Sequence, residues 1–440
     1  MGKWGGVERV RRSAMRVALR RFVEDFQLEA ADSSLQAFNI HSLIAAVMAT
    51  TTTTILEAPE FNPSLRPSTS RPYGYAEAFI PALTAQCHAS NLLLLPNGDL
   101  LCAWFGGSIE GRPDICIYMS RLLAGKKVWT DAVKMTHDHT RSEQNPLLFR
   151  NSSNGEVRLL YTSQNAGNQD SAIVKQIIST DGGANWSGPT VLFGDAGTFI
   201  RQPMVVLDDG AWVIPIFKCR AEPGTRWLGS DDISCIRISR DEGNTWSERE
   251  IPNSYGCVHM NIQRLKDSTY LGLYRSRWAD RVYMSTSRDG LEWTEPKATL
   301  LPNPNAGICF DVLPSGRVVL IYNHSSKEDA LGRRDGLYDD ISDGTDTRAN
   351  QATKHGKEAF WGAPRAPLCV AWSDDNGLTW SRKTLEEGDG YCLTNDSEKK
   401  RNRELSYPSI LAEENGTIHI AFTFWRQRIK YMQLRGDFFE

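Results

Sequence analysis

Paired apolar runs, each pair separated by a tight turn, recur six times after residue 85. Apolar and polar residues alternate within the runs, as in RVVLIY and TIHIAF, and this period of two is typical of β-strands. Five of the six turns contain Asn-Gly, Asp-Gly or Ser-Gly, and glycine tolerates the positive φ that tight hairpin turns require. The pattern predicts six β-hairpins, at residues 92–105, 147–161, 204–217, 262–274, 310–322 and 410–422.

A second motif follows most of the hairpins. A third strand is predicted after each of the first five hairpins, and four of these strands end in the pattern S-x-D-x-G-x-x-W. The Asp side chain can accept backbone N–H bonds across the turn, glycine takes the positive φ, and tryptophan folds back as an apolar plug. We therefore expect a scaffold role for the four matches, at residues 179–186, 239–246, 287–293 (one residue short) and 373–380.

This combination resembles the Asp-box, or BNR, repeat of the sialidase superfamily, over about residues 85–435. The resemblance implies an all-β fold, a six-bladed β-propeller, and the six hairpins give the same number of blades. The last unit has a third strand at 429–434 but no box, so we expect the segment just before His88 to supply its outer strand and close the ring. We predict a sialidase-like propeller over residues 85–440, preceded by an N-terminal extension and linker over residues 1–84.

Composition and charge narrow the class of protein. The 440 residues carry a net charge of −3, with 40% hydrophobic and 23% charged residues, as in ordinary soluble globular proteins. This balance argues against a nucleic-acid partner, and no apolar run is long enough for a membrane span. We expect a monomer whose partner is a carbohydrate.

The cysteines and the N-terminal segment indicate in which cellular compartment the protein is expected. The nine cysteines are odd in number, lie mostly in strand-like apolar runs and form no CxxC or metal-spaced cluster, so we expect buried, reduced thiols. Reduced thiols favour the cytoplasm. Residues 1–21 carry seven basic residues and one acidic residue, which leaves organelle targeting as the alternative. No metal or cofactor motif occurs, and we expect neither.

Strand direction predicts which residues face a common site. If the Asp-box turns lie on one face of the propeller, the starts of the first strands, the ends of the second strands and the starts of the third strands lie on the other, where inner strands converge on the axis. Polar residues open all six first strands: His88, Glu143 and Asn145, Arg201 and Gln202, His259 and Asn261, Asn305, and Glu404 and Tyr407. The connections after the second strands add further charged residues, among them Glu110, Arg112, Asp114, Arg275 and Arg277. Satisfied core polar groups and inter-blade salt bridges are the alternative interpretation, above all for Arg281, Arg426 and Arg428.

The resemblance also implies roles. Sialidases in general use a tyrosine nucleophile helped by a glutamate, an aspartate as acid/base catalyst, and three arginines on the substrate carboxylate. Carried to this chain, Tyr407 is the nucleophile, Glu404 or Glu143 makes it more basic, and Asp114 is the acid/base catalyst. Arg201, Arg275 and Arg277 hold the carboxylate, and the other candidate substrate contacts are Gln202, His259, Asn261, Asn145 and Arg112. The family's first arginine, in an Arg-Ile-Pro motif, has no match here, and His88 stands near that place.

Three functions fit these residues. The first is a sialidase-like glycoside hydrolase that acts exo on an acidic sugar, such as a sialic acid or a uronic acid. The second is a polysaccharide lyase in which His88, His259 and Tyr407 move protons during β-elimination from a uronate, a role that suits the ordinary pKa of histidine. The third is a propeller that binds a glycan or a protein without catalysis.

One long insertion belongs to the site face. About 44 residues separate Tyr322 from Pro367, far more than a usual hairpin connection. By the strand-direction argument this segment leaves from the site face, and we predict that it folds over the axis as a lid. A surface loop without fixed structure is the alternative.

Overall fold

The computed structural model describes residues 60–67, 75–341, 348–350 and 352–439. The described strands belong to one unit, residues 61–440. The basic segment at residues 1–21, on which the organelle-targeting alternative rests, lies outside the described residues. The regular elements of the described residues are strands and short 3-10 helices. None of the described helices is long and apolar enough to cross a membrane.

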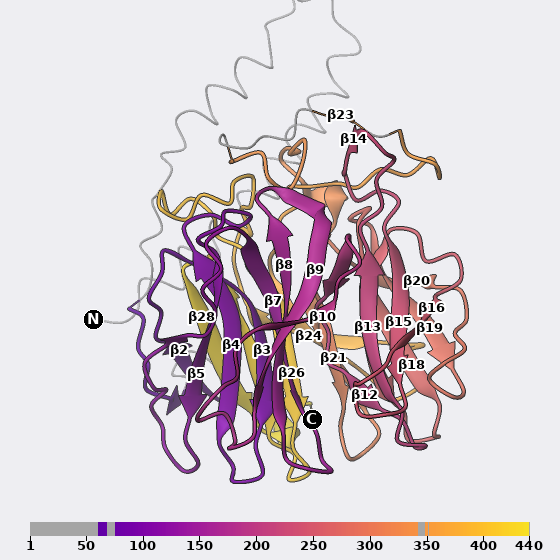
Figure 1. Ribbon diagram of the computed structural model, residues 1–440. Coiled ribbons are helices and arrows are strands. Elements are labelled where there is room, and N and C mark those ends of the chain that lie inside the picture. Colours follow the sequence, from indigo (N-terminus) through magenta and orange to yellow (C-terminus); the bar gives the residue numbers. More distant parts are fainter. Residues whose placement is uncertain (1–59, 68–74, 342–347, 351, 440) are drawn as a thin grey trace, which may run out of the picture. The chain divides into compact units, whose positions relative to one another are not determined.

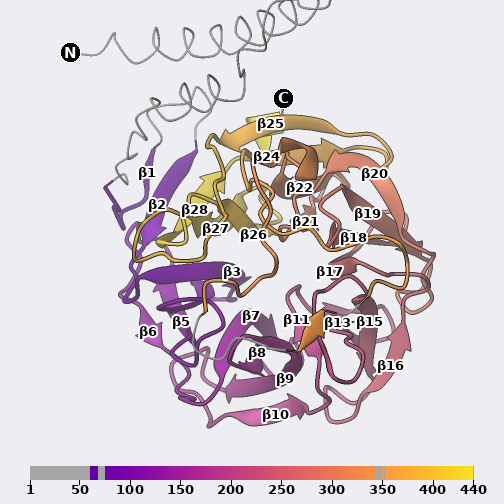
Figure 2. The same ribbon diagram turned by 90° about the horizontal axis from the view of Figure 1, so that it is seen from above.

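Six blades surround a central axis, as expected for a β-propeller (Figures 1 and 2). Blade 1 contains β3 (Gln86–Leu94), β4 (Leu100–Gly107), β5 (Cys116–Leu122) and β6 (Val133–Lys134). Blade 2 contains β7 (Ser142–Arg150), β8 (Val157–Asn165), β9 (Asn168–Ser179) and β10 (Thr190–Phe193). Blade 3 contains β13 (Trp212–Lys218), β15 (Ile233–Ser239) and β16 (Ser247–Glu250), with an inner strand in two pieces, β11 (Thr198–Ile200) and β12 (Val205–Val206).

The other three blades follow in chain order. Blade 4 contains β17 (Cys257–Arg264), β18 (Tyr270–Ser276), β19 (Arg281–Ser287) and β20 (Lys297–Pro302). Blade 5 contains β21 (Cys309–Val312), β22 (Val318–Asn323), β24 (Leu368–Ser373) and β25 (Ser381–Glu386). Blade 6 contains β26 (Leu405–Ala412), β27 (Ile418–Phe424) and β28 (Arg428–Leu434), and its outer strands come from earlier in the chain.

Chain from before His88 completes blade 6. Strand β2 (Ala76–Ile80) pairs antiparallel with β28, and β1 (Arg66–Pro67) pairs with β2. Without β2, the backbone groups along one side of β28 would lack their sheet partners. The expected outer strand is therefore present, and the propeller includes part of the range 1–84 that the sequence analysis assigned to the extension and linker.

Apolar contact between neighbouring blades forms the core. Six buried clusters lie at the six interfaces between consecutive blades, and a seventh lies beneath the insertion of blade 5. The four Asp-box tryptophans reinforce this arrangement. Each packs against the cluster that its blade shares with the preceding blade: Trp186, Trp246, Trp293 and Trp380. All nine cysteines are buried and unpaired.

The Asp-box carboxylates accept hydrogen bonds from backbone N–H groups. Asp181 accepts bonds from the backbone N–H groups of Ala184 and Asn185, at 3.1 and 2.9 Å, and these bonds lower its pKa to about 2. Trp186 donates its indole N–H to the Gly183 carbonyl at 3.2 Å. The same bonding recurs around Asp241, Asp289 and Asp375. These carboxylates therefore stabilise turns at the end of the blades away from the starts of the inner strands.

A buried carboxylate links blade 5 to blade 6 and yields a stability prediction. Asp311 accepts the backbone N–H of Ala412 at 2.8 Å, and burial raises the pKa of Asp311 to about 6. Folding therefore favours the protonated form, and this contribution to stability declines as pH rises from about 4, the unfolded pKa, through about 6. We expect Asp311→Asn, which keeps an oxygen for Ala412 but removes the charge, to raise the free energy of unfolding by about 1–3 kcal/mol at pH 7.5.

Urea unfolding at several pH values measures this effect. The difference between Asp311→Asn and the wild-type protein should shrink toward zero at pH 4, where both side chains are neutral. An equal difference at pH 4 and pH 7.5 would show that the charge is not responsible.

Candidate active site

The innermost strands change direction where they meet the axis. Five residues at this end of inner strands have positive φ values between 48° and 60°: Ala89, Asn145, His259, Asn305 and Tyr407. In blades 1, 2, 4 and 6 the pairing register with the second strand shifts at the same place. Such bulges redirect side chains, and strained backbone of this kind is concentrated at functional sites. The bulges turn side chains of separate blades toward one another.

Tyr407 lies at the centre of this convergence. Its side chain is buried, and its hydroxyl accepts a hydrogen bond from Nη1 of Arg275. The His88 ring lies on one side, with ring centroids 4.2 Å apart, and the His259 ring lies at 5.7 Å. The structure thus brings together residues from blades 1, 4 and 6 that strand direction placed on one face.

Three guanidinium groups surround the Tyr407 ring. Their Cζ atoms lie 5.4 to 5.6 Å from its centroid and belong to Arg275, Arg365 and Arg201. Sequence reasoning did not select Arg365, which ends the insertion three residues before β24. Its position at the start of a third strand was the available signal, because that end of the strand lies on the site face. We call these three arginines with Tyr407, His88 and His259 the Tyr407 cluster.

Arg201 and Gln202 reach across the axis from the gap between β11 and β12. Nη2 of Arg201 donates to the carbonyls of Ser90, Tyr407 and Pro408 at 3.1, 3.2 and 3.0 Å. Nε2 of Gln202 donates to the carbonyl of Ile308 at 2.5 Å. Blade 3 is thereby tied to blades 1, 5 and 6, and the broken inner strand explains why these side chains are free to extend inward.

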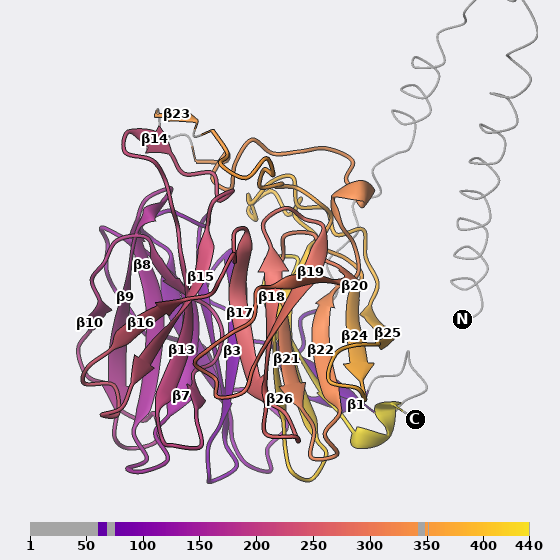
Figure 3. The same cartoon turned by 90° about the vertical axis from the view of Figure 1, so that its right-hand side faces the viewer.

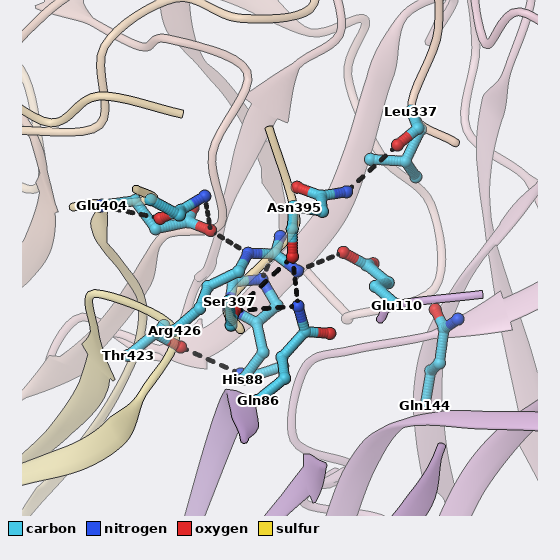
Figure 4. Close-up of polar contacts among 12 residues, drawn as sticks. Gln86, His88, Glu110, Gln144, Leu337, Asn395, Ser397, Glu404, Thr423 and Arg426 are labelled. Carbon is cyan, nitrogen blue, oxygen red and sulfur yellow. Dashed lines mark hydrogen bonds and ion pairs between the residues drawn. The ribbon is translucent and has the colours of Figure 1, made fainter. Parts of the chain in front are cut away.

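A buried ion network borders the cluster, and Figure 4 shows its members Glu404, Arg426 and Glu110. Glu404 accepts bonds from Arg365 at 2.5 Å, from Nε of Arg426, from the Ser406 hydroxyl at 2.8 Å and from Nδ2 of Asn402 at 3.4 Å. Burial alone would raise the pKa of Glu404, but Arg365 and Arg426 hold it well below its usual range. Arg426 also bonds to Glu110 at 2.6 Å. The side-chain partners of Glu404 are therefore two arginines, a serine and an asparagine, while the partner of the Tyr407 hydroxyl is Arg275.

The surroundings of both histidines of the cluster favour the neutral imidazole. Burial lowers the pKa of His88 and of His259 well below the usual value, and the arginines around them add to the effect. Nδ1 of each ring is buried and has no hydrogen-bond partner among the described residues. A neutral imidazole can donate or accept a proton, so each ring is available to a bound molecule.

Other predicted residues lie away from the Tyr407 ring. Arg277 donates to Asp232 at 2.9 Å, and its guanidinium lies over Trp227 and Trp361. Asn261 accepts the backbone N–H of Phe310 at 2.7 Å and so joins blade 4 to blade 5. Asn145 lies in the bulge of blade 2, and its buried Oδ1 has no hydrogen-bond partner among the described residues.

The predicted acidic residues and Arg112 have separate surroundings. Glu143 is buried beside Lys175, 3.9 Å away, at the boundary of blades 1 and 2, and burial raises its pKa. Asp114 is exposed and accepts bonds from the backbone N–H and hydroxyl of Ser108 at 2.8 and 2.9 Å. Arg112 lies in the same loop and is half-buried. Glu110, earlier in this loop, is the member that reaches the buried network.

The insertion of blade 5 crosses the site face (Figures 2 and 3). Its Tyr338 hydroxyl accepts bonds from Gln164 and Gln169 of blade 2 at 2.9 and 3.0 Å. Around Tyr338, apolar residues of the insertion pack on Ile109 of blade 1, Phe199 of blade 3 and Val258 of blade 4. Farther along, β23 (Ala349–Asn350) pairs with β14 (Thr225–Arg226), at the top of Figure 1. The described residues of the insertion therefore cross the axis on the site face, as expected.

The cluster is enclosed in this conformation. Tyr407 is 7% exposed and His88 is 1% exposed. Two hollows border the insertion, one of about 230 Å³ beside Tyr338 and one of about 510 Å³ beside His355, and Tyr407 lines neither.

Charge favours an anionic ligand here. Arg201 and Arg275 contact no carboxylate within the part of the chain that the structure describes, whereas Arg277, Arg365 and Arg426 each do. Burial lowers the pKa of Arg275 to about 9, so an anion beside it would favour its charged form. The described His, Cys, Asp and Glu side chains form no group of three or more that could hold a metal ion.

Comparison with known proteins agrees with this architecture. The family model described as a BNR repeat-like domain matches residues 98–420. No curated protein matches the chain. Among solved structures, a protein of unknown function from Dyadobacter fermentans is similar with a TM-score of 0.60 and 14% identity, over 85% of this chain and 99% of that one.

Two sialidases are similar at comparable levels. The Hadza microbial sialidase Hz136 has a TM-score of 0.58 and 16% identity, over 80% of this chain and 66% of its own. The NanB sialidase from Streptococcus pneumoniae has a TM-score of 0.54 and 11% identity, over 80% of this chain and 69% of its own. At these identities the similarity shows a shared fold.

The bonds of Arg201 predict a role in stability. Arg201→Met should lower the free energy of unfolding by about 1–3 kcal/mol, because three inward carbonyls lose a donor while a buried charge is removed. Urea unfolding measures this loss. The control is Arg240→Met, whose side chain is 61% exposed in a surface ion pair. Equal stability of the two variants would show that the axial bonds contribute nothing.

The two bonds of Tyr338 predict local opening of the insertion. Tyr338→Phe keeps the apolar contacts and removes the hydroxyl, so residues 334–341 should exchange backbone hydrogens faster with little change in global stability. Hydrogen exchange read by mass spectrometry tests this expectation. Tyr391→Phe, which removes a hydroxyl bonded to Arg401 at 3.3 Å, is the control. Unchanged exchange at 334–341 would assign the closed state to the apolar contacts alone.

Proposed function

Because the chain belongs to the BNR repeat-like domain family, we propose that this propeller is a carbohydrate-active enzyme, a sialidase-like glycoside hydrolase acting exo on an acidic sugar. The observation that carries the proposal is the Tyr407 cluster: a tyrosine hydroxyl on an arginine, within a ring of three guanidinium groups. Guanidinium groups bind carboxylates through two parallel hydrogen bonds. A sugar that carries a carboxylate fits this charge, whether it is a sialic acid or a uronic acid.

Tyr407 is the proposed nucleophile. Its oxygen attacks the anomeric carbon, the bond from that carbon to the glycosidic oxygen breaks, and the leaving oxygen takes up a proton. A phenol suits an anomeric centre next to a carboxylate, because a neutral attacking group meets less repulsion than a carboxylate would. Arg275 donates to the Tyr407 oxygen and stabilises negative charge on it.

The surroundings of Tyr407 suggest where its proton goes. Glu404 is engaged by Arg365 and Arg426, and Glu143 lies beside Lys175, so neither carboxylate is placed to serve Tyr407 directly. We assign proton acceptance to the His259 ring, 5.7 Å from the Tyr407 ring between centroids; burial and four arginines lower its pKa, and the carboxylate of a bound acidic sugar would offset those charges. Asp114 stays the proposed acid for the leaving oxygen, because it lies on the exposed part of the blade 1 loop where a leaving group would depart.

A second function is favoured by the same two histidines. Neutral rings on two sides of Tyr407 would suit a lyase, which removes the proton next to a uronate carboxylate and breaks the C–O bond at the neighbouring carbon. A lyase product carries a double bond that absorbs in the ultraviolet, whereas a hydrolase product does not. We rank this second because the nucleophile position is occupied by a tyrosine on an arginine.

The test of the proposal is a substrate screen. The full chain is incubated with sialosides, uronides and neutral glycosides, and the products are identified by mass spectrometry and ultraviolet absorbance. Release of an acidic monosaccharide supports the hydrolase, and an unsaturated uronate supports the lyase. Binding of an acidic sugar without turnover would leave a non-catalytic propeller as the function.

Substitution at the nucleophile gives the sharpest expectation. Tyr407→Phe removes only the oxygen, so turnover should fall by about 10³-fold or more while the thermal transition stays close to that of the wild-type protein. Tyr391→Phe, at a half-buried tyrosine outside the Tyr407 cluster whose hydroxyl bonds to Arg401, should leave turnover unchanged. Activity of Tyr407→Phe within about tenfold of wild type would exclude Tyr407 as the nucleophile.

A further inference from the structure

His88 has one ring nitrogen on a cation and the other without a partner. Nε2 lies 3.4 Å from Nη2 of Arg426, while Nδ1 is buried with no hydrogen-bond partner among the described residues (Figure 4). The ring is 1% exposed and is fixed between Phe105, at 5.3 Å between centroids, and Tyr407, at 4.2 Å. These contacts leave the ring little freedom to turn over.

The chemistry of Arg426 decides which nitrogen of His88 carries the proton. A guanidinium has only donors, so Nε2 must be the acceptor in this contact. In a neutral imidazole one nitrogen carries the proton when the other accepts a bond, which places the proton of His88 on Nδ1. The unpartnered nitrogen is therefore a donor.

Arg426 is itself held from two sides. Its Nε bonds to Glu404 at the start of blade 6, and its Nη1 bonds to Glu110 in the loop of blade 1 at 2.6 Å. These two bonds set the plane of the guanidinium and leave Nη2 for His88. Arg426 is 1% exposed, and its two carboxylate partners, Glu404 and Glu110, lie far apart in the chain.

We propose that Arg426, held by Glu404 and Glu110, fixes His88 in its Nδ1–H tautomer, so that His88 donates a hydrogen bond from Nδ1 to an oxygen of the acidic sugar bound at Tyr407. The sugar in this statement rests on the proposed function, whereas the tautomer does not. Arg426, Glu404 and Glu110 act through His88 and are positioning residues. A buried N–H without a partner is unfavourable, and a sugar hydroxyl or carboxylate oxygen would satisfy it.

This assignment bears on the choice between the two reactions. A ring with its proton on Nδ1 and Arg426 on Nε2 cannot take up a proton at Nδ1, so His88 is excluded as the base of a lyase. The charged groups that act on the ring are Arg426, Arg365 and Arg201 against the single carboxylate Glu404, and together with burial they oppose a second proton.

Nitrogen-15 NMR of the full chain labelled on histidine tests the tautomer without a ligand. The spectra distinguish a nitrogen that carries hydrogen from one that does not, and loss of one signal set in His88→Asn assigns the ring. We expect hydrogen on Nδ1 and none on Nε2 between pH 6 and pH 8. Hydrogen on Nε2, or on both nitrogens, would overturn the proposal.

A charge-matched double variant tests the role of Arg426. Arg426→Met with Glu110→Gln removes one buried positive and one buried negative group together, and Arg365 continues to pair with Glu404. We expect part or all of the His88 signal to change to the Nε2–H form. A pure Nδ1–H signal in this variant would show that Arg426 does not set the tautomer.

Two substitutions at His88 test donation to the sugar. The amide nitrogen of asparagine can replace an Nδ1 donor, whereas that of glutamine replaces Nε2. In titrations with sialic acid and with D-glucuronic acid, His88→Asn should stay within about threefold of wild-type affinity and His88→Gln should lose at least about tenfold. Equal losses would overturn the donor role. Failure of both sugars to bind the wild-type protein would overturn the proposed function, while the NMR result would still decide the tautomer.

Discussion

The centre of this propeller depends on hydrogen bonds that one guanidinium makes across the axis. Nη2 of Arg201 leaves blade 3 and bonds to carbonyls of blades 1 and 6, including that of Tyr407, whose backbone has a positive φ. Inner strands that converge on an axis leave peptide groups without ladder partners, and such groups are costly when buried. A long side chain with several donors satisfies them from the opposite blade. The bulge that presents Tyr407 and the interruption in blade 3 are two parts of one arrangement.

Around this centre, charge organises the site more than shape does. Glu404 binds two arginines, and those arginines extend to Tyr407, to Glu110 and to His88. Buried ions are expensive unless each has its partners, and such networks fix their members in place. Within the Tyr407 cluster, Arg201 and Arg275 are the two arginines without a carboxylate partner among the described residues. The insertion then covers the cluster with apolar side chains on three blades, which excludes water and strengthens every charge interaction beneath it.

The fold could be predicted from the sequence because each of its hairpins and turns has a local sequence pattern. Alternating runs, Gly-containing turns and the Asp boxes identified six hairpins and four third strands, and strand direction placed His88, His259, Arg275 and Tyr407 on one face. The remainder depends on features without a local signal. A bulge shifts the alternation by one residue, so the sequence could not say that Glu143 would lie beside Lys175 and away from Tyr407. Arg365 lies at the end of a long insertion, and two of the three bonds of Arg201 join residues more than 200 positions apart.

Strand β2 has a consequence for how the ring is made. It pairs with β28, about 350 residues later in the chain, so blade 6 is not complete until nearly all of the propeller has been synthesised. Contacts of such long separation slow folding. During translation β2 waits with an unpaired edge, which is a site for pairing with other chains. The polar Glu77 and the short length of β2 limit the risk of pairing with other chains. The ring closes only when the strands of the last blade have formed.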